Sequence, residues 1–451
     1  MESKTNTQDK AAVPEEKTST SFLSLFGLRN FRLLWISEAV SVIGDQFYLI
    51  ALPWLVLNLT GDALAMGTVL ALAAVPRALF LLVGGALTDR FSPRMVMFVS
   101  NFMRMALVLL LSVPVLSGNI AMWMIYSLAL LFGLADAFFY PAQSAIIPRL
   151  VRDDQLQGAN AILQGTWQLS LFAGPVLAGT LIAMMAGDAS AGGDLRGIGL
   201  ALVIDGLSFL ISAVFLWFVD DGGTAVSGGG EKERLFAAIR EGLQMVWRDP
   251  ALRAFFVLIA ISNFLIIGPL SIGVPVLAAN RFAGGAAAFG IIMSAYGGGL
   301  LLGTILAGVL PRPPAKHMGI VLGLIWSGLG LGIIGLGLAQ ATYMAAAIAL
   351  LMGVAEGYVV ILFITWLQRR TTEAVLGRMM SLLMFASVGL QPLSNMLTGA
   401  LIGLNAQFLF LIFGALMIFI TLVFLFNPAV RSMGITAQSK PLLSQSATSV
   451  E

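Results

Sequence analysis

The decamer GALTDRFSPR, residues 85–94, is the short charged turn on which the fold of this chain depends, because it joins two long apolar runs. Pro93 fits a tight turn. Asp89 ends one predicted helix and Arg90 and Arg94 open the next, so their side chains can tie the two helices together through hydrogen bonds. Any polytopic membrane protein places charges in its loops, so the rest of the chain has to establish the class.

The composition places most of the chain in lipid. Of the 451 residues, 58% are hydrophobic and only 11% are charged, whereas a soluble domain carries about 25% charged residues. The polar ends, residues 1–28 and 429–451, are predicted to be disordered cytoplasmic tails, and the first of them is not a cleavable signal peptide.

Several classes of function are disfavoured by residues that the chain lacks. It has no cysteine, so there is no disulfide framework, no thiolate metal site and no cysteine nucleophile. The single histidine, His317, falls in a loop, and there is no nucleotide-binding loop or H-E-x-x-H motif. We therefore expect no enzyme, no catalytic residues, no metal and no cofactor. The net charge of +2 is too small to indicate nucleic acid as a partner.

Twelve apolar segments each approach the ~20 residues that a membrane-spanning helix needs. The sequence thus predicts an all-α integral membrane protein with two pseudo-symmetric six-helix bundles, residues 29–219 and 251–428. The twelve predicted segments are Phe31–Asn58, Ala63–Thr88, Arg94–Ser117, Ile120–Ile147, Gln155–Ala186, Gly197–Val219, Ala251–Ala279, Ala286–Leu310, His317–Leu338, Ala341–Leu367, Val375–Leu404 and Gln407–Phe426.

The distribution of lysine and arginine predicts the topology. Of the 25 such residues, all but four fall on one side of the membrane when both termini are placed in the cytoplasm. The exceptions are Arg77 and Arg104 inside helices and Arg196 and Arg281 in outer loops. This positive-inside bias predicts a multi-pass protein of the cytoplasmic membrane with both termini inside.

The connection between the two bundles, residues 220–250, is predicted to be cytoplasmic. After a Gly-rich start, Leu235, Ile239, Leu243 and Val246 recur at helical spacing with charges between them. This pattern predicts a short amphipathic helix on the inner membrane surface, and the alternative is a simple tether.

An internal repeat supports the division into two halves. LLFGLADAFF around Asp136 aligns with LLMGVAEGYV around Glu356 at an offset of 220 residues, and the same offset pairs Gly179 with Gly399. In transporters built from two such halves, the binding site lies between them near the middle of the membrane.

Charged residues inside the predicted helices are the candidate site. At about 1.5 Å per residue, Asp45, Arg77, Arg104 and Asp136 lie roughly 15–21 Å from the inner ends of their helices. A charge at that depth costs about 2.5–3.5 kcal/mol, so it needs a partner, a cavity or a function. Glu356 lies at the matching depth in the second half.

Two interpretations of these charges stay open. Either the four charges of the first half are permanently paired and hold its bundle together, or at least one acid changes protonation during transport. We favour Asp45, because Glu38, Ser41 and Asp45 form one polar stripe on their helix, although Glu38 is equally well explained as structural. Glu356 is the charge expected to meet substrate in the second half.

Two polar side chains beside these charges complete the candidate set. Tyr140 and Gln143 follow Asp136 at i+4 and i+7, and they either line the cavity or form interhelical hydrogen bonds. For Asp205, deep in the sixth segment, a packing or water-contacting role is expected.

Two motifs resemble those of the major facilitator superfamily of transporters. Residues 85–94 have the form G-x-x-x-D-R-x-x-x-R, beginning at Gly85, and resemble the superfamily's loop between the second and third helices, which acts as a cytoplasmic gate latch. Gly174, Pro175 and Gly179 resemble the motif of its proton-driven exporters, although alanine precedes Gly179 where glycine is usual.

Shorter strings resemble the branch that contains the enterobactin exporter and the macrolide efflux proteins. They are S-x-x-G-D at 41–45, A-L-P-W at 51–54, Y-P-A-Q-S-A at 140–145, R-E-G-L at 240–243 and R-D-P at 248–250. The resemblance implies twelve helices, alternating access, and export of a siderophore, a macrolide-like drug or another amphipathic compound in exchange for protons.

The expected partners are therefore a small-molecule substrate, protons and the lipid bilayer, with the chain acting as a monomer. Small-molecule uptake, by symport or facilitated diffusion, is the alternative within transport. A non-transporting membrane receptor is a further alternative.

Overall fold

The chain forms two bundles of long helices. The computed structural model describes residues 22–88, 91–186, 193–222, 243–311, 313–314, 317–371 and 373–426, and within these ranges every regular element is helical. Eleven of the helices are long and apolar enough to cross a membrane. The predicted fold class is thus confirmed.

The first bundle consists of six long helices, whose ends lie within a few residues of the predicted ends. Gly61 ends the first of them in the left-handed conformation (φ 62°), which glycine adopts without strain. Ser92 caps the N-terminus of the third by accepting a hydrogen bond from the Met95 amide. The six helices are α2 (Arg29–Thr60), α3 (Ala63–Thr88), α4 (Pro93–Leu116), α5 (Met122–Leu150), α6 (Leu156–Met185) and α7 (Gly193–Trp217).

The second bundle repeats this plan with two irregular helices. Its first helix contains one π-turn, where Pro269 lacks the amide hydrogen that a regular helix uses. The helical segments are α9 (Pro250–Gly268), η2 (Pro269–Gly273), α10 (Val274–Asn280), α11 (Ala286–Val309), α12 (Met318–Leu338), α13 (Thr342–Arg370), α14 (Glu373–Val388), α15 (Gln391–Ile402) and α16 (Ala406–Leu425).

One predicted segment, Val375–Leu404, is wrong as a single continuous helix. The chain turns at residues 389–390 and restarts as α15. Pro392 has no amide hydrogen to donate to the Val388 carbonyl, so the helical hydrogen-bond pattern is interrupted at this point. Together α14 and α15 supply the twelfth crossing.

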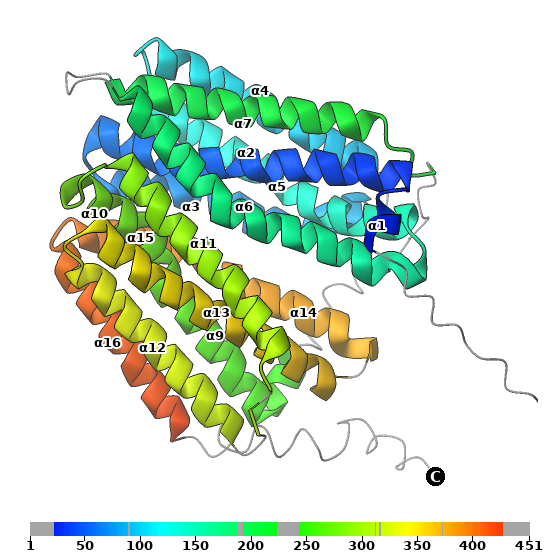
Figure 1. The fold of residues 1–451 in the computed structure, drawn as a ribbon, viewed down its shortest axis with the longest axis vertical. Coiled ribbons are helices and arrows are strands. Elements are labelled where there is room, and N and C mark those ends of the chain that lie inside the picture. Colours follow the sequence, from blue (N-terminus) through cyan, green and yellow to red (C-terminus); the bar gives the residue numbers. More distant parts are fainter. Residues whose placement is uncertain are drawn as a thin grey trace, which may run out of the picture.

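The two bundles meet at one end and diverge toward the other (Figure 1). The end where they meet carries the connection between α2 and α3 and the start of α11. The diverging end carries the short helix α1 (Phe22–Leu25) and the end of α16. The contacts between the halves run mainly between α6 and α11 and between α3 and α15.

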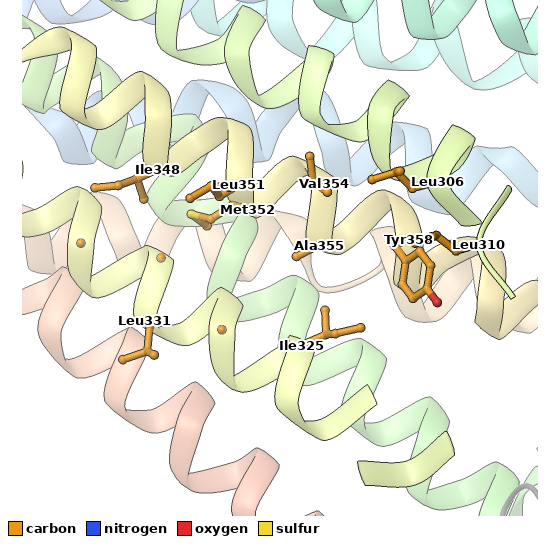
Figure 2. Close-up of a pocket in the computed structure, with 13 residues that line it drawn as sticks. Leu306, Leu310, Ile325, Leu331, Ile348, Leu351, Met352, Val354, Ala355 and Tyr358 are labelled. Atoms are coloured by element: carbon orange, nitrogen blue, oxygen red, sulfur yellow. The ribbon is translucent and has the colours of Figure 1, made fainter. Parts of the chain in front are cut away.

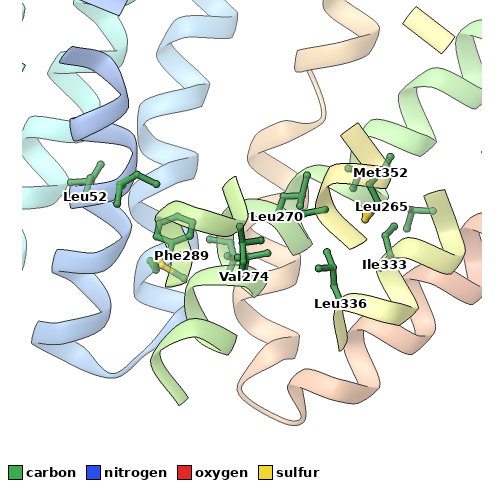
Figure 3. Packing of buried hydrophobic residues seen from close by; sticks show 14 of the residues in the cluster. Leu52, Leu265, Leu270, Val274, Phe289, Ile333, Leu336 and Met352 are labelled. Carbon is green, nitrogen blue, oxygen red and sulfur yellow. The ribbon is translucent and has the colours of Figure 1, made fainter. Parts of the chain in front are cut away.

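The hydrophobic core is continuous between the two bundles at the end where they meet and not at the end where they diverge. A large cluster of buried side chains continues from the first bundle into the second, and Leu52 of α2, Phe289 of α11 and Val274 of α10 lie close together in it (Figure 3). A smaller cluster, which includes Phe31, belongs to the first bundle alone at the diverging end. Apolar burial therefore joins the halves at one end only.

Part of the predicted N-terminal tail is ordered. Residues 22–25 form the helical turn α1, and Leu25 is buried. The Phe26 ring packs edge-on against Trp35 with 4.9 Å between ring centroids. These apolar side chains are why the chain is ordered here, seven residues before the predicted boundary of the tail.

The other predicted termini and most of the linker lie outside the described residues. These are residues 1–21, 223–242 and 427–451. Of the predicted amphipathic helix, residues 243–248 are described and are helical, with Leu243 exposed and Val246 buried. The amphipathic helix itself stays a prediction.

Candidate functional site

The structure brings the four charges of the first half into one cluster. Asp136 of α5 lies between two arginines, with Oδ2 3.3 Å from Nε of Arg77 and Oδ1 3.1 Å from Nη1 of Arg104. Oδ1 of Asp45 on α2 lies 3.9 Å from the same Nη1 atom of Arg104. Arg104 therefore faces two carboxylates, one close and one at the limit of an ion pair.

Arg104 of α4 is held in place by groups other than the acids. Its guanidinium lies 4.3 Å from the centroid of the Phe139 ring and 4.5 Å from that of Phe209, an arrangement that stabilises a buried cation. Its Nη2 atom donates to the side-chain oxygen of Asn101. These contacts hold the Arg104 guanidinium in place independently of its two acidic partners, which lie at different distances from it.

Asn101 extends this network to α7 and, through α7, back to α2. Its Nδ2 atom donates to Oγ of Ser212 on α7 at 2.7 Å, and the hydroxyls of Ser212 and Ser37 on α2 share a hydrogen bond of 2.6 Å. Sequence reasoning missed Asn101, Ser37 and Ser212. The sequence signal that could have found them is a small polar residue on a helix that also carries an intramembrane charge. Such a residue, once buried, requires a hydrogen-bond partner.

The cluster is buried on one side and open on the other. The side chain of Arg104 is only 2% exposed and that of Asp136 is 10% exposed, whereas Asp45 and Arg77 are 26% and 37% exposed. Arg77 also lies over the Tyr140 ring, 5.0 Å from its centroid. Asp45 and Arg77 are consequently the charges of this cluster that solute reaches.

Glu38 and Gln143 form a separate contact. Gln143 of α5 donates to Oε2 of Glu38 on α2 at 2.7 Å. Glu38 is 2% exposed, and its Oε1 atom has no hydrogen-bond partner among the described residues. Within the polar stripe predicted on the first spanning helix, Glu38 is thus contacted by α5 through one of its two oxygens, and Asp45 is contacted by Arg104.

Glu356 has one described partner in the second half. The Tyr296 hydroxyl of α11 donates to Oε2 of Glu356 on α13. Glu356 thus has a neutral donor as its partner, whereas Asp136 in the first half has two cationic partners. The structure does not join Glu356 to the four-charge cluster, and Tyr296 was missed because a single tyrosine in an apolar helix carries no distinctive pattern.

The motif on α6 lies where three helices pack closely. A side chain at Gly174 would collide with Gln46 of α2. A Cβ atom at Gly179 would lie 3.0 Å from Cα of Gly290 on α11 and would collide with the Ala286 carbonyl oxygen. Nearby, the backbone amide of Val176 donates to Oγ of Ser294 at 2.8 Å, across the two halves. The motif thus forms part of the junction between the bundles.

Only part of the predicted gate motif is described. Asp89 and Arg90 lie outside the described residues, and Gly85 is part of helix α3. Arg94 donates through Nη1 to the Val219 carbonyl at 2.7 Å. The same atom lies 3.4 Å from the Trp217 carbonyl, so Arg94 contacts the end of α7, where a cation is favourable near the helix C-terminus.

A cavity of about 560 Å³ lies elsewhere, on the side of the second bundle. Leu306, Ile325, Leu351 and Met352 point into the space between α11, α12 and α13, with Tyr358 near one end (Figure 2). Almost all of its lining is hydrocarbon. Glu356 is not among the lining residues, so this cavity and the charged side chains occupy different faces of α13.

Comparisons with known proteins agree with this architecture. The family model described as Major Facilitator Superfamily matches residues 34–386. The chain is 22% identical to macrolide efflux protein A of Streptococcus pyogenes over 396 residues, which cover 87% of this chain and 94% of that protein. It is 25% identical to the multidrug efflux pump Tap of Mycolicibacterium fortuitum over 408 residues, covering 88% and 95%.

A solved structure supports the fold alone. The nucleoside transporter NupG superposes with a TM-score of 0.70 at 13% sequence identity, covering 88% of this chain and all of the other.

Proposed function

This chain belongs to the major facilitator superfamily, and from that premise we propose that it exports a small amphipathic molecule in exchange for protons. The family makes it a membrane transporter and not an enzyme. Two of its relatives carry the names of efflux proteins, which favours export over uptake.

One observation supports proton exchange most directly: Arg104 faces both Asp45 and Asp136. When Asp45 binds a proton, Arg104 keeps its closer partner, Asp136, so no buried cation is left unpaired. Losing the only partner of a buried charge is costly. Asp45 is also the more exposed of the two acids. These properties suit a carboxyl group that gains and loses a proton in each transport cycle.

The shape of the molecule corresponds to one state of alternating access. The bundles are joined by α6, α11, α3 and α15 at one end and diverge at the end that carries the first and last described helices. The positive-inside distribution of lysine and arginine favours a cytoplasmic position for that open end. We therefore interpret the structure as inward-open, the state in which an exporter receives its substrate.

Substrate is proposed to bind between the halves, near Asp45, Asp136 and Glu356. Glu356 has a neutral hydrogen-bond partner, Tyr296, so its charge remains available to a basic group of the substrate. In the first half, Asp136 is already held by two arginines. This asymmetry favours compounds that combine an apolar body with a basic or hydrogen-bonding group.

The turn at residues 85–94 is proposed to latch the cytoplasmic gate in the opposite, outward-open state. Replacing Asp89 by Asn should impair transport while the protein still inserts and purifies normally. Full activity of this variant would count against the latch.

The deciding experiment is proton movement in inside-out vesicles with an imposed pH gradient. Catecholate siderophores, macrolides, lipophilic cations and lysophospholipids are added to the wild type, to Asp45→Asn and to the control Asp62→Asn, which changes an exposed acid at a helix start. A compound that collapses the gradient in the wild type and the control, but not in Asp45→Asn, supports the proposal.

Two other outcomes revise it. If the gradient collapses in all three proteins, export by proton exchange stands and the coupling site moves to Asp136 or Glu356. If no compound affects the gradient but the compounds accumulate inside right-side-out vesicles, export is wrong and the protein is an uptake carrier.

A further inference from the structure

A fifth acid, Asp205 of α7, is enclosed inside the first bundle and takes no part in the site described above. Its exposed fraction is 0%. Gly44 of α2 packs closely against this part of α7, since a Cβ atom at that position would collide with the side chain of Ser208 and would lie 3.1 Å from Oδ1 of Asp205. The carboxyl group is thus held between α2 and α7, away from solvent.

Neither oxygen of this carboxyl has a hydrogen-bond partner among the described residues. The Ser208 hydroxyl, one helical turn further along α7, donates to the backbone carbonyl of Asp205 at 2.7 Å. Two other buried groups nearby are also without partners, the Tyr48 hydroxyl and Nε of Arg104. Buried polar atoms that lack protein partners bind water or carry a proton.

The charged groups around Asp205 come from two of the three helices packed against α7. Those helices are α2, α4 and α6. Asp45 on α2 and Arg104 on α4 are the charges whose fields act on Asp205, and Tyr48 on α2 is the titratable group beside them. The third helix, α6, has no titratable residue along its length.

A count of charges indicates the protonation state. Inside the first bundle lie four carboxyl groups, those of Glu38, Asp45, Asp136 and Asp205, and two guanidinium groups, those of Arg77 and Arg104. Asp136 is paired with both arginines and Asp45 shares one of them. The surplus acids are Asp205 and Glu38, and an unpaired carboxylate in a low-dielectric interior binds a proton rather than remain charged.

We propose that Asp205 is a second proton-binding site of this transporter, filled and emptied through Asp45. The inference rests on the proton exchange proposed above. Asp205 itself has no contact with solvent. Asp45, which directly follows Gly44 on α2, is partly exposed. The O–H bond of the Asp205 carboxyl breaks, and water carries the proton to the Asp45 carboxylate, which passes it to bulk solvent.

Arg104 compensates for the charge that this transfer creates. Its Nε–H group has no acceptor among the described residues. Because the Arg104 charge acts on Asp205, we expect the guanidinium to stabilise the carboxylate that forms when Asp205 loses its proton. A transporter with both sites moves one more proton in each cycle than one with Asp45 alone.

The test uses the full-length protein in detergent and needs no substrate. Infrared spectra across a pH step record the C=O stretch of protonated carboxyl groups, and a pH indicator counts the protons released per molecule. The variants are Asp205→Asn, which imitates the protonated acid in size, Asp205→Ser as a smaller alternative, Asp45→Asn, and Asp62→Asn as the exposed control.

We expect a band from a buried protonated carboxyl that is lost in both Asp205 variants, with one proton fewer released per molecule, and is unchanged in Asp62→Asn. In Asp45→Asn the band should remain after the pH step, because the route to solvent is lost. A wild-type spectrum without a band that depends on Asp205 would show an ionised carboxylate and overturn the proposal. A band that persists at every pH would show a permanently neutral, structural acid and overturn it equally.

A missing second proton site and a lack of proton exchange with substrate give different experimental results. If Asp205 releases its proton through Asp45 but no compound moves protons in vesicles, the second site stands and exchange with substrate is wrong. If a compound does collapse the gradient, the ratio of protons to substrate, measured by balancing the two gradients, should fall by one in Asp205→Asn. An unchanged ratio would overturn the second site.

Discussion

At the scale of single residues, Asp136 is the centre of the charged cluster. It is the acid that both arginines contact, Arg77 at 3.3 Å and Arg104 at 3.1 Å, and it is almost fully buried. Asp45 lies further from Arg104 and is more exposed. The two acids are therefore expected to differ in role, Asp136 holding the arginines and Asp45 exchanging the proton.

Replacing Asp136 by Asn should destabilise the protein more than replacing Asp45 by Asn. The change leaves Arg104 with only its distant partner, and removing one member of a buried pair costs about 3–5 kcal/mol. We expect the lower part of that range, because Arg77 is partly exposed. The difference in stability is measured by heating each variant in detergent and using size-exclusion chromatography to determine how much folded protein remains. The double variant Asp136→Asn with Arg77→Gln should recover part of the loss, and equal melting of the two single variants would contradict the assigned roles.

At the scale of helices, the contact between α6 and α11 depends on glycine at several positions. At Gly179, Gly290 and Gly297 a side chain would collide with backbone atoms of the other helix, which cannot move aside as a side chain can. Small residues at helix interfaces allow this approach in lipid, where van der Waals packing is the main attraction. The same contact contains the motif that resembles that of proton-driven exporters.

Replacing Gly179 by Val should therefore separate the two halves at their closed end. The matched control is Gly165→Val in the same helix, where a Cβ atom meets nothing within 4 Å. Because the chain has no cysteine, spin labels can be placed at Asn119→Cys and Gln340→Cys, both exposed, without removing any native thiol. We expect a longer distance between the labels in Gly179→Val and no change in the control, and unchanged distances in both would refute the role of this contact.

At the scale of the whole molecule, the halves are joined at one end by backbone contacts and by the hydrogen bond between the Val176 amide and Ser294. The large core continues across this junction, whereas the smaller one stays within the first bundle. Transport by alternating access requires this junction to open and the opposite end to close.

A reversible cross-link across the junction should stop transport. The double variant Val176→Cys with Ser294→Cys places two thiols across the α6–α11 contact, and oxidation should trap the present state. We expect vesicle transport of the active compound to be lost on oxidation and restored by reductant, with each single-cysteine variant unaffected. Full activity of the oxidised, cross-linked protein would rule out opening at this end.

The fold class and most helix ends could be predicted from the amino-acid sequence. A run of about 20 apolar residues has few alternatives to a spanning helix, and Ala63–Thr88 has the predicted bounds. The break at Gly389–Leu390 was missed because a proline in a spanning helix does not always interrupt it. The ordered turn at residues 22–25 was missed because its apolar contacts come from residues distant along the chain.

The candidate site was only partly accessible to sequence reasoning. Depth along a helix follows from counting residues, so the sequence located Asp45, Arg77, Arg104 and Asp136 in one layer. It could not say that Arg104 faces two acids, that Glu356 has Tyr296 for a partner, or that Asp205 has none, since these depend on the rotation of each helix about its axis. That rotation is set by packing against neighbouring helices, so the pairing of the charges can be read from the tertiary structure and not from the sequence.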